Sequence, residues 1–290
     1  MILVTGANGQ YGNATINHLL DQDARAEEII AMVRNTESAK ELKEKGVQIR
    51  KGDYNDYSSL VSAFSGVKHL LFISSSDIQN RNKQHENVLK AAKESGVEHI
   101  IYTSFLSKNE TESSPLWLVS QSHLQTENWL KDSGINYTIL KNNLYMDFVP
   151  AFVGDQVLET GLVFLPAGDG KVGAVLRSEM AEATARILGS SKLQGKVYNF
   201  TNSEAFSYQE VANTIAEISG KSIDYISPTA EEYARILGEY GVPSDLIGLF
   251  SSFAIAQAKD ELDAVSSDLE FLLGRKPTSM STFLSKVYSK

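Results

Sequence analysis

The sequence contains no cysteine, six prolines and two tryptophans among its 290 residues. The absence of cysteine excludes disulfides, thiolate metal sites and a cysteine nucleophile. The remaining composition, 42% hydrophobic and 22% charged, is ordinary for a folded protein, and disorder is not expected. The five histidines, which lack metal-ligand spacing and so predict no metal site, are His18, His69, His85, His99 and His123.

Long apolar runs and an excess of basic charge are also missing. No stretch of about 18 apolar residues occurs that could span a membrane. The first expected strand starts at Met1, which leaves no room for a leader peptide. The net charge of −9 argues against a nucleic-acid partner, which normally requires a basic face. We therefore expect a cytoplasmic protein without a membrane or nucleic-acid partner.

A glycine-rich turn dominates the first dozen residues. An apolar run of strand type ends at Gly6, glycine recurs at Gly9 and Gly12, and a helix-like segment follows over 13–20. Residues without a Cβ allow a tight turn, a close approach of a pyrophosphate and close packing of the helix. The helix N-terminus adds free N–H donors and a positive dipole end. This order of strand, turn and helix predicts a dinucleotide site rather than a turn that binds nothing.

Apolar runs of strand length then alternate with segments of helical period, which predicts parallel strands joined by crossover helices. The expected strands are 29–34, 47–50, 69–74, 99–103 and 137–141, and the expected helices are 58–64, 82–95 and 115–131. Gly96 and Gly134 stand where helix C-terminal caps are expected. The predicted fold class is α/β, with a Rossmann-type doubly wound parallel sheet.

The alternation loosens beyond Leu144. Expected strands at 162–165, 196–200 and 223–226 and expected helices at 178–188 and 207–219 are followed by mostly helical material. We predict an NADP-binding Rossmann domain over 1–144, with returning segments near 171–200. A smaller, mostly helical and discontinuous C-terminal lobe over 145–290 is expected to cover the carboxyl ends of the strands, where ligands of open α/β sheets bind.

The residue that closes the second expected strand indicates which dinucleotide binds. An acidic residue there bonds the ribose 2′-hydroxyl, whereas an arginine accommodates a 2′-phosphate. The strand ends in Val33, Arg34 and Asn35, and no carboxylate follows until Glu37. We therefore expect NADPH, with Arg34 at the 2′-phosphate rather than serving as a solvated surface charge.

Polar residues follow the next three expected strands. They are Asp53 and Tyr54 after the third strand, Ser74, Ser75 and Ser76 after the fourth, and Thr103, Ser104 and Phe105 after the fifth. Small hydroxylated residues let a ribose or nicotinamide lie close while offering donors and acceptors. Any one of them alone could equally be an ordinary polar loop residue, but their recurrence at successive strand ends indicates a ligand crevice.

The usual catalytic pair of short-chain dehydrogenases is missing. Those enzymes use a tyrosine whose pKa is lowered by a lysine one helical turn later. Only Tyr137 and Lys141 have that spacing, but both lie in a β-branched segment. On a strand, residues four apart are separated by roughly 13 Å at about 3.3 Å per residue, so this lysine cannot tune this tyrosine.

The helix over 115–131 carries a different pair. Helical spacing places His123 and Glu127 on one face. A histidine oriented by a carboxylate could donate a proton or position a substrate. The alternative is a satisfied, partly buried histidine with a capping or bridging role. Tyr145 is a second candidate for contact with the substrate, and aromatic packing is its alternative role.

An ordered set of segments resembles the NmrA-like atypical short-chain dehydrogenases, and above all the type 2 NAD(P)H:quinone oxidoreductases, relatives of triphenylmethane reductase. The segments are Gly6–Gly12, Val33–Asn35, Gly52–Tyr54, Leu71–Ser75, Ile101–Ser104, His123–Glu127, Tyr137–Asn142 and Ala167–Lys171. The resemblance covers essentially the whole chain. Two departures, Asn8 for a common threonine and Lys141 for a frequent arginine, leave the identity of the substrate open.

The strand-end residues and the resemblance together give the expected site. The resemblance implies that the cofactor is bound by Gly6–Tyr11, Arg34, Ser74–Ser76 and Tyr137–Asn142, and that the Gly168–Gly173 turn lies near the substrate. The expected cofactor-binding residues are Gly6, Ala7, Asn8, Gly9, Gln10, Tyr11, Arg34, Asp53, Tyr54, Ser74, Ser75, Ser76, Thr103, Ser104, Tyr137, Lys141, Asn142 and Asn143. The expected substrate-binding residues are Phe105, Gly168, Asp169, Gly170 and Lys171. His123 and Tyr145 remain the catalytic candidates.

The resulting prediction is an NADPH-dependent oxidoreductase that reduces quinones or related electron-poor aromatic acceptors. A quinone accepts hydride with little acid assistance and takes protons from water, so the missing tyrosine and lysine pair is tolerable. The alternative is a non-catalytic NADP(H) sensor that regulates a partner. Sugar-nucleotide epimerisation would need the absent tyrosine. The sequence leaves the oligomeric state open, with a homodimer as one option.

Overall fold

The computed structural model describes residues 1–289 and contains two compact units. The first unit comprises Met1–Phe105, Val119–Asn142 and Arg177–Asn199. The second comprises Leu106–Leu118, Asn143–Leu176 and the chain from Phe200 onward. The chain therefore leaves the first unit and re-enters it more than once.

The first unit is built on a seven-stranded parallel sheet in the order β3-β2-β1-β4-β5-β6-β8. The strands are β1 Ile2–Val4, β2 Ile29–Val33, β3 Gln48–Lys51, β4 His69–Phe72, β5 His99–Phe105, β6 Asn136–Asn142 and β8 Val197–Phe200. Central strands such as β2 are buried along their whole length. This explains their continuous apolar sequence, since a parallel sheet is covered on both faces.

The order of the strands reverses at β1, which pairs with β2 on one side and β4 on the other. Ligands of doubly wound sheets bind at the carboxyl ends of the strands at such a reversal. The glycine turn follows β1, and the Ser74–Ser76 segment follows β4. The topology thus brings two separate predicted cofactor segments to the same edge of the sheet.

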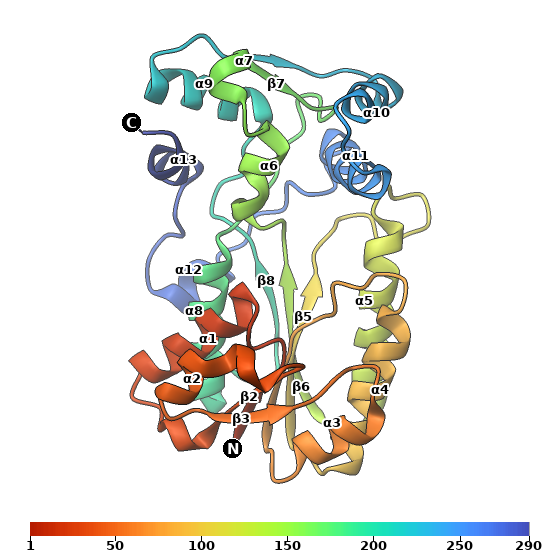
Figure 1. Ribbon diagram of the computed structural model, residues 1–290, viewed down its shortest axis with the longest axis vertical. Coiled ribbons are helices and arrows are strands. Elements are labelled where there is room, and N and C mark those ends of the chain that lie inside the picture. Colours follow the sequence, from red (N-terminus) through yellow and green to blue (C-terminus); the bar gives the residue numbers. More distant parts are fainter. Residues whose placement is uncertain (290) are drawn as a thin grey trace. The chain divides into compact units, whose positions relative to one another are not determined.

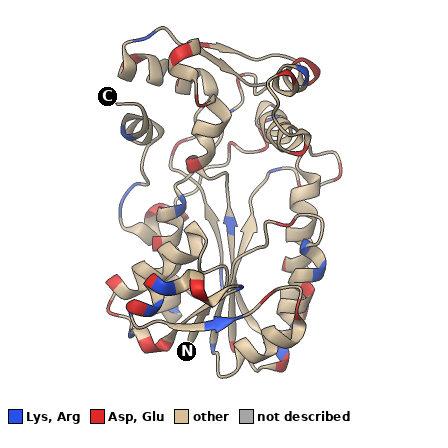
Figure 2. Ribbon diagram, viewed as in Figure 1, with Lys and Arg blue, Asp and Glu red and all other residues tan. Residues whose placement is uncertain are grey.

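Helices cover both faces of this sheet (Figure 1). On one face lie α1 Gln10–Asp21, α2 Lys40–Glu44 and α8 Arg177–Gly189, and on the other lie α3 Tyr57–Phe64, α4 Arg81–Glu94 and α5 Trp117–Asp132. Short 3-10 turns at Ala26–Glu28, Thr36–Ala39 and Ser191–Leu193 complete the unit. Figure 2 shows acidic and basic residues interspersed over these helices rather than gathered by sign.

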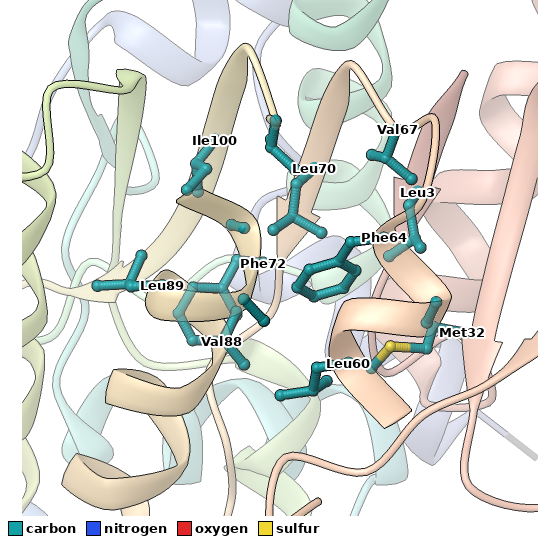
Figure 3. Packing of buried hydrophobic residues seen from close by; sticks show 14 of the residues in the cluster. Leu3, Met32, Leu60, Phe64, Val67, Leu70, Phe72, Val88, Leu89 and Ile100 are labelled. Atoms are coloured by element: carbon teal, nitrogen blue, oxygen red, sulfur yellow. The ribbon is translucent and has the colours of Figure 1, made fainter. Parts of the chain in front are cut away.

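The core between the sheet and the α3–α4 face is apolar and closely packed (Figure 3). Phe64 of α3 lies among Leu3 of β1, Leu70 of β4 and Leu60 of its own helix, and all four are fully buried. Burying a side chain of this size stabilises the fold by about 1.5–3 kcal/mol. This packing holds the strands, and hence their carboxyl ends, in place.

The second unit contains a small parallel sheet, β7 Leu162–Phe164 with β9 Asp224–Ile226, and mostly helices. The helices are the 3-10 turn Met146–Phe148, α6 Val149–Val153, α7 Val157–Thr160, α9 Tyr208–Ser219, α10 Ala230–Glu239, α11 Ser244–Ala258, α12 Asp268–Leu273 and α13 Met280–Tyr288. The α9 helix begins at a capping box of Ser207 and Glu210 and ends at Gly220, whose φ is +70°.

The structure confirms the predicted Rossmann-type α/β fold. The α2 helix was not predicted, because it is five residues long and buries only Leu42, so it has no apolar period. Within residues 1–289, every helix is too short or too polar to cross a membrane.

Candidate functional site

The glycine turn leaves the start of α1 open to an anion. Gly6 has a φ of +58°, which favours glycine, and a Cβ at Gly12 would lie 2.5 Å from the Gly6 carbonyl oxygen. Gly9 is the N-cap and provides no side chain to the helix. Within the described residues no side chain caps the N–H groups of the first turn, so they are available to a phosphate.

Two side chains of this turn are engaged elsewhere. Tyr11 is buried, and its hydroxyl lies 2.8 Å from the Thr184 hydroxyl of α8. Only its backbone amide is placed for a phosphate, so its predicted role does not involve the phenol. The Asn8 carboxamide donates a hydrogen bond to the Ser38 hydroxyl.

The loop after β4 is tied to the glycine turn. Thr5 Oγ1 accepts the Ile73 amide at 2.9 Å, and Thr103 Oγ1 accepts the Ser74 amide at 2.9 Å. The Tyr54 hydroxyl lies 2.5 Å from Thr5 Oγ1 and 2.7 Å from the Ile73 carbonyl oxygen. Burial raises the pKa of Tyr54, so it remains a neutral phenol. Thr103 and Tyr54 therefore act by fixing the loop.

The end of β2 presents an available cation. Arg34 is exposed and has neither a hydrogen bond nor an ion pair to any residue within 1–289. Asn35, which follows, accepts the Glu37 amide and starts the next turn. Asp53 behaves differently, since its carboxylate accepts the Asn55 amide at 2.9 Å and stabilises its own loop.

Of the two roles left open for His123, the structure does not show the one that depends on Glu127, since no hydrogen bond joins the two side chains within residues 1–289. Glu127, which is 4% exposed, accepts the Ser104 hydroxyl at 2.6 Å. The ammonium of Lys141 lies 3.8 Å from the same carboxylate, and that of Lys131 lies 4.0 Å from it. His123 and Glu127 share a helix face as predicted, but the Glu127 carboxylate is directed to β5 and β6.

His123 instead pairs with a tyrosine from β5. Its Nδ1 lies 2.7 Å from the hydroxyl of Tyr102, and its ring lies 6.2 Å from that of Phe105. Burial, with Arg81 nearby, holds the pKa of His123 well below its ordinary value. The imidazole is therefore neutral near pH 7 and cannot serve as a cationic proton donor. This is the satisfied buried histidine that the sequence left as an alternative.

Buried neutral histidines should make the protein sensitive to mild acid. Burial lowers the pKa of His85 to about 3 and of His99 to about 4, each from 6.5. Between pH 6.5 and these values the unfolded chain binds protons that the folded chain does not, so stability falls as pH falls. Each histidine contributes a slope of at most about 1.4 kcal/mol per pH unit.

Urea unfolding between pH 7.5 and 5 measures this slope. His99→Gln keeps a polar partner for Thr138, which His99 contacts at 2.9 Å, but removes one titrating group. In this variant the free energy of unfolding should depend less steeply on pH. A free energy of unfolding that stays constant from pH 7 to 5 would contradict the burial of these rings in neutral form.

The end of β6 separates three predicted residues by role. Asn142 is 3% exposed, and neither its Oδ1 nor its Nδ2 has a hydrogen-bond partner within residues 1–289. Asn143 is fully used, since it donates to the Leu262 carbonyl at 2.9 Å and accepts the Leu144 amide. Tyr137 lies at the opposite end of the strand and packs against the apolar core. Of the three, only Asn142 has free hydrogen-bonding capacity at a carboxyl strand end.

The remaining predicted residues lie in the second unit. The Tyr145 ring lies beside that of Phe148 in a tilted arrangement, with centroids 5.9 Å apart. A Cβ at Gly170 would lie 1.9 Å from the Gln257 carbonyl oxygen, so close packing alone requires that glycine. Lys171 is paired with Glu210 at 3.2 Å. These contacts hold the Ala167–Lys171 turn within the second unit.

The sequence profile of the NmrA-like family matches residues 1–284. The chain belongs to the NmrA-like family. This confirms the resemblance inferred from the ordered segments.

Proteins with described activities are similar over the whole chain. Quinone oxidoreductase 2 of Escherichia coli is 36% identical over 289 residues, which cover 100% of this chain and 99% of that protein. The crystal structure of the E. coli NADPH-dependent quinone oxidoreductase with NADPH has a TM-score of 0.93 and covers 100% of both chains. Triphenylmethane reductase of Citrobacter sp., complexed with NADP(H), is 38% identical, with a TM-score of 0.91 and coverage of 99% and 100%.

The sequence reasoning passed over polar residues that this NmrA-like chain buries on α4. Arg81, Gln84 and His85 share the buried face of that helix with Val88 and Leu89. Charged or polar residues at apolar-period positions were the available signal, because burying them is costly unless they are paired. The spacing of the five histidines did not distinguish His85 from the others.

Proposed function

We propose that this protein is an NADPH-dependent oxidoreductase that transfers hydride to quinones or related electron-poor aromatic acceptors. One observation carries the proposal. Within residues 1–289, the start of α1 has no side-chain cap and Arg34 has no partner, and both lie beside the reversal of strand order. The chain also matches an NADPH-bound quinone oxidoreductase from end to end.

The residues of the first unit suit NADPH. The amides of the first turn of α1 would bind the diphosphate, because they are uncapped and glycine lets the phosphate approach. Arg34 would bind the 2′-phosphate by charge-assisted hydrogen bonds. Ser74, Ser76 and Asn142 would offer polar groups to the ribose and nicotinamide end.

The side chains themselves need to supply little of the chemistry. Bound NADPH supplies the hydride. The chain must orient the dinucleotide and exclude water around it. The neutral His123 and the buried phenol of Tyr54 do not release protons near pH 7, because burial disfavours their charged forms. A quinone suits such a site, since it takes its protons from water.

NADPH oxidation with a panel of quinones and triphenylmethane dyes tests the proposal. Turnover of at least one acceptor is expected, and no turnover with any of them would remove it. A sensor would bind NADPH without consuming it, and the relatives do not favour that alternative. Contacts of Phe105, Tyr145 and the Gly168–Lys171 turn with the acceptor, a cytoplasmic location and a homodimer stay predictions.

Replacing Asn142 by leucine should separate stability from activity. Its carboxamide makes no hydrogen bond to the residues that the structure describes, and a buried unsatisfied polar group costs about 1–3 kcal/mol. Asn142→Leu should therefore leave the free protein equally or more stable, while kcat/KM falls about tenfold.

The matched control is the neighbouring Asn143→Leu. That change breaks hydrogen bonds to Leu262 and Leu144 and should lower the free energy of unfolding by about 1–3 kcal/mol. Urea unfolding and steady-state kinetics measure both variants. Normal kinetics for Asn142→Leu would refute its assignment to the site.

A further inference from the structure

We propose that His85 and Arg81 of α4 are positioning residues that hold the Ser75 backbone in place for the dinucleotide. This deepens the proposed function and rests on it. Neither side chain was expected to take part in the site. They act through Ser75 rather than on the reacting atoms.

The two side chains form hydrogen bonds with the two backbone polar groups of one residue, Ser75. The Ser75 amide donates to His85 Nε2 at 3.0 Å, and Arg81 Nε donates to the Ser75 carbonyl at 2.7 Å. His85 is completely buried and Arg81 is 6% exposed. Arg81 also donates to the Val119 carbonyl at 3.3 Å, which ties the loop to α5.

The hydrogen bonds fix the protonation of His85. A backbone amide can only donate, so Nε2 must be unprotonated and Nδ1 must carry the proton. Nδ1 lies 2.8 Å from Thr126 Oγ1, which in turn donates to the Ser122 carbonyl at 2.7 Å. Because burial depresses the pKa of His85, this neutral tautomer persists through the physiological range.

These contacts complete a rigid support for the loop. The amide of Ile73 is held by Thr5 and that of Ser74 by Thr103. The Ser75 amide is the next in line, and Ser76 beyond it is exposed. The loop lies beside the glycine turn, since a Cβ at Gly6 would meet Ile73 at 3.7 Å.

The support explains why α4 buries an imidazole and a guanidinium at apolar-period positions. Apolar side chains would pack there without the cost of desolvating polar groups. A loop held in its binding geometry before the ligand arrives loses less freedom on binding. Removing either contact with Ser75 should therefore lower the affinity for the dinucleotide and change the rate of the chemical step much less.

Four variants test this role by NADPH titration and steady-state kinetics. His85→Leu removes the acceptor for Ser75 and should raise the KM and Kd for NADPH about tenfold, equivalent to about 1.4 kcal/mol, with kcat within about twofold. His85→Gln can present a carbonyl oxygen to the same amide and should recover most of the affinity.

Arg81→Met, which releases the Ser75 carbonyl, should raise the KM for NADPH by a similar factor, and it provides the test if His85→Leu does not fold. His99→Leu, a buried histidine at the other end of β5, should lose stability with KM unchanged.

The outcomes separate the two proposals. An unaltered protein that neither binds nor oxidises NADPH overturns the proposed function, and this inference with it. If the unaltered protein is active, an unchanged KM in His85→Leu and Arg81→Met overturns the positioning role alone. An equal rise of KM in His99→Leu would also overturn it, because the effect would then follow general destabilisation.

Discussion

In the Gly12→Ala variant, the affinity for NADPH is expected to fall on the order of a hundredfold, about 2.7 kcal/mol. The added Cβ would lie 2.5 Å from the Gly6 carbonyl oxygen and 3.0 Å from the Ala7 Cα. Both neighbours are backbone, so α1 must move away from the turn that it opens. The amides of its first turn then no longer converge on one phosphate. Isothermal titration calorimetry with NADPH measures the loss.

A second glycine provides the control for this change. Gly238 of α10 is exposed, and apart from the backbone of its own helix no described atom lies within 4 Å of an added Cβ. Gly238→Ala should bind NADPH normally and gain up to about 1 kcal/mol of stability from helix propensity. Circular dichroism would verify that Gly12→Ala remains folded. Retention of full affinity in a folded Gly12→Ala protein would rule out the glycine turn as the diphosphate site.

Arg34→Ala is expected to lower kcat/KM for NADPH by about 30-fold to 100-fold and to leave kcat/KM for NADH nearly unchanged. Hydrogen bonds to a charged group contribute about 1.5–3 kcal/mol each, and only NADPH carries the 2′-phosphate that would receive them. Arg34 has no partner within residues 1–289 to release, so its removal should not destabilise the fold. Kinetics with both cofactors, at matched ionic strength, measure the difference.

Lys43→Ala is the matched control for Arg34. Lys43 is an exposed cation on the nearby α2 helix, and its loss changes the net charge by the same amount. It should lower NADPH use by less than about twofold, because exposed charges are screened by salt. An equal loss of NADPH and NADH activity in Arg34→Ala would mean that this arginine does not recognise the 2′-phosphate.

The hydrogen-bond partners of His123 and Glu127 inside the first unit could not be predicted from local sequence patterns. Helical spacing placed His123 and Glu127 on one face of α5, and both are indeed buried there. Their partners, Tyr102 and Ser104, come from β5, a different part of the chain. Spacing fixes which residues share a face of a helix, whereas the strand packed against that face decides which atoms meet.

The end of β6 makes the same point on a smaller scale. Asn142 and Asn143 are adjacent, both are asparagine, and both were predicted to bind the cofactor. Asn142 is the last residue of β6, whereas Asn143 lies beyond the strand and belongs to the second unit. One carboxamide meets the Leu262 carbonyl in the second unit, and the other meets no protein group among those described. Only the fold could separate a structural asparagine from one available to a ligand.

The sequence by itself determined the fold class, the glycine turn and the arginine that follows β2. These are local matters, because backbone sterics, strand or helix period and helix ends are set within a few consecutive residues. Tertiary structure alone decided that the turn after β1 lies beside the loop after β4, and that His85 and Arg81 grip Ser75. Those contacts join residues far apart in the chain, and the packing of strands and helices, rather than any local pattern, brings their atoms within hydrogen-bond distance.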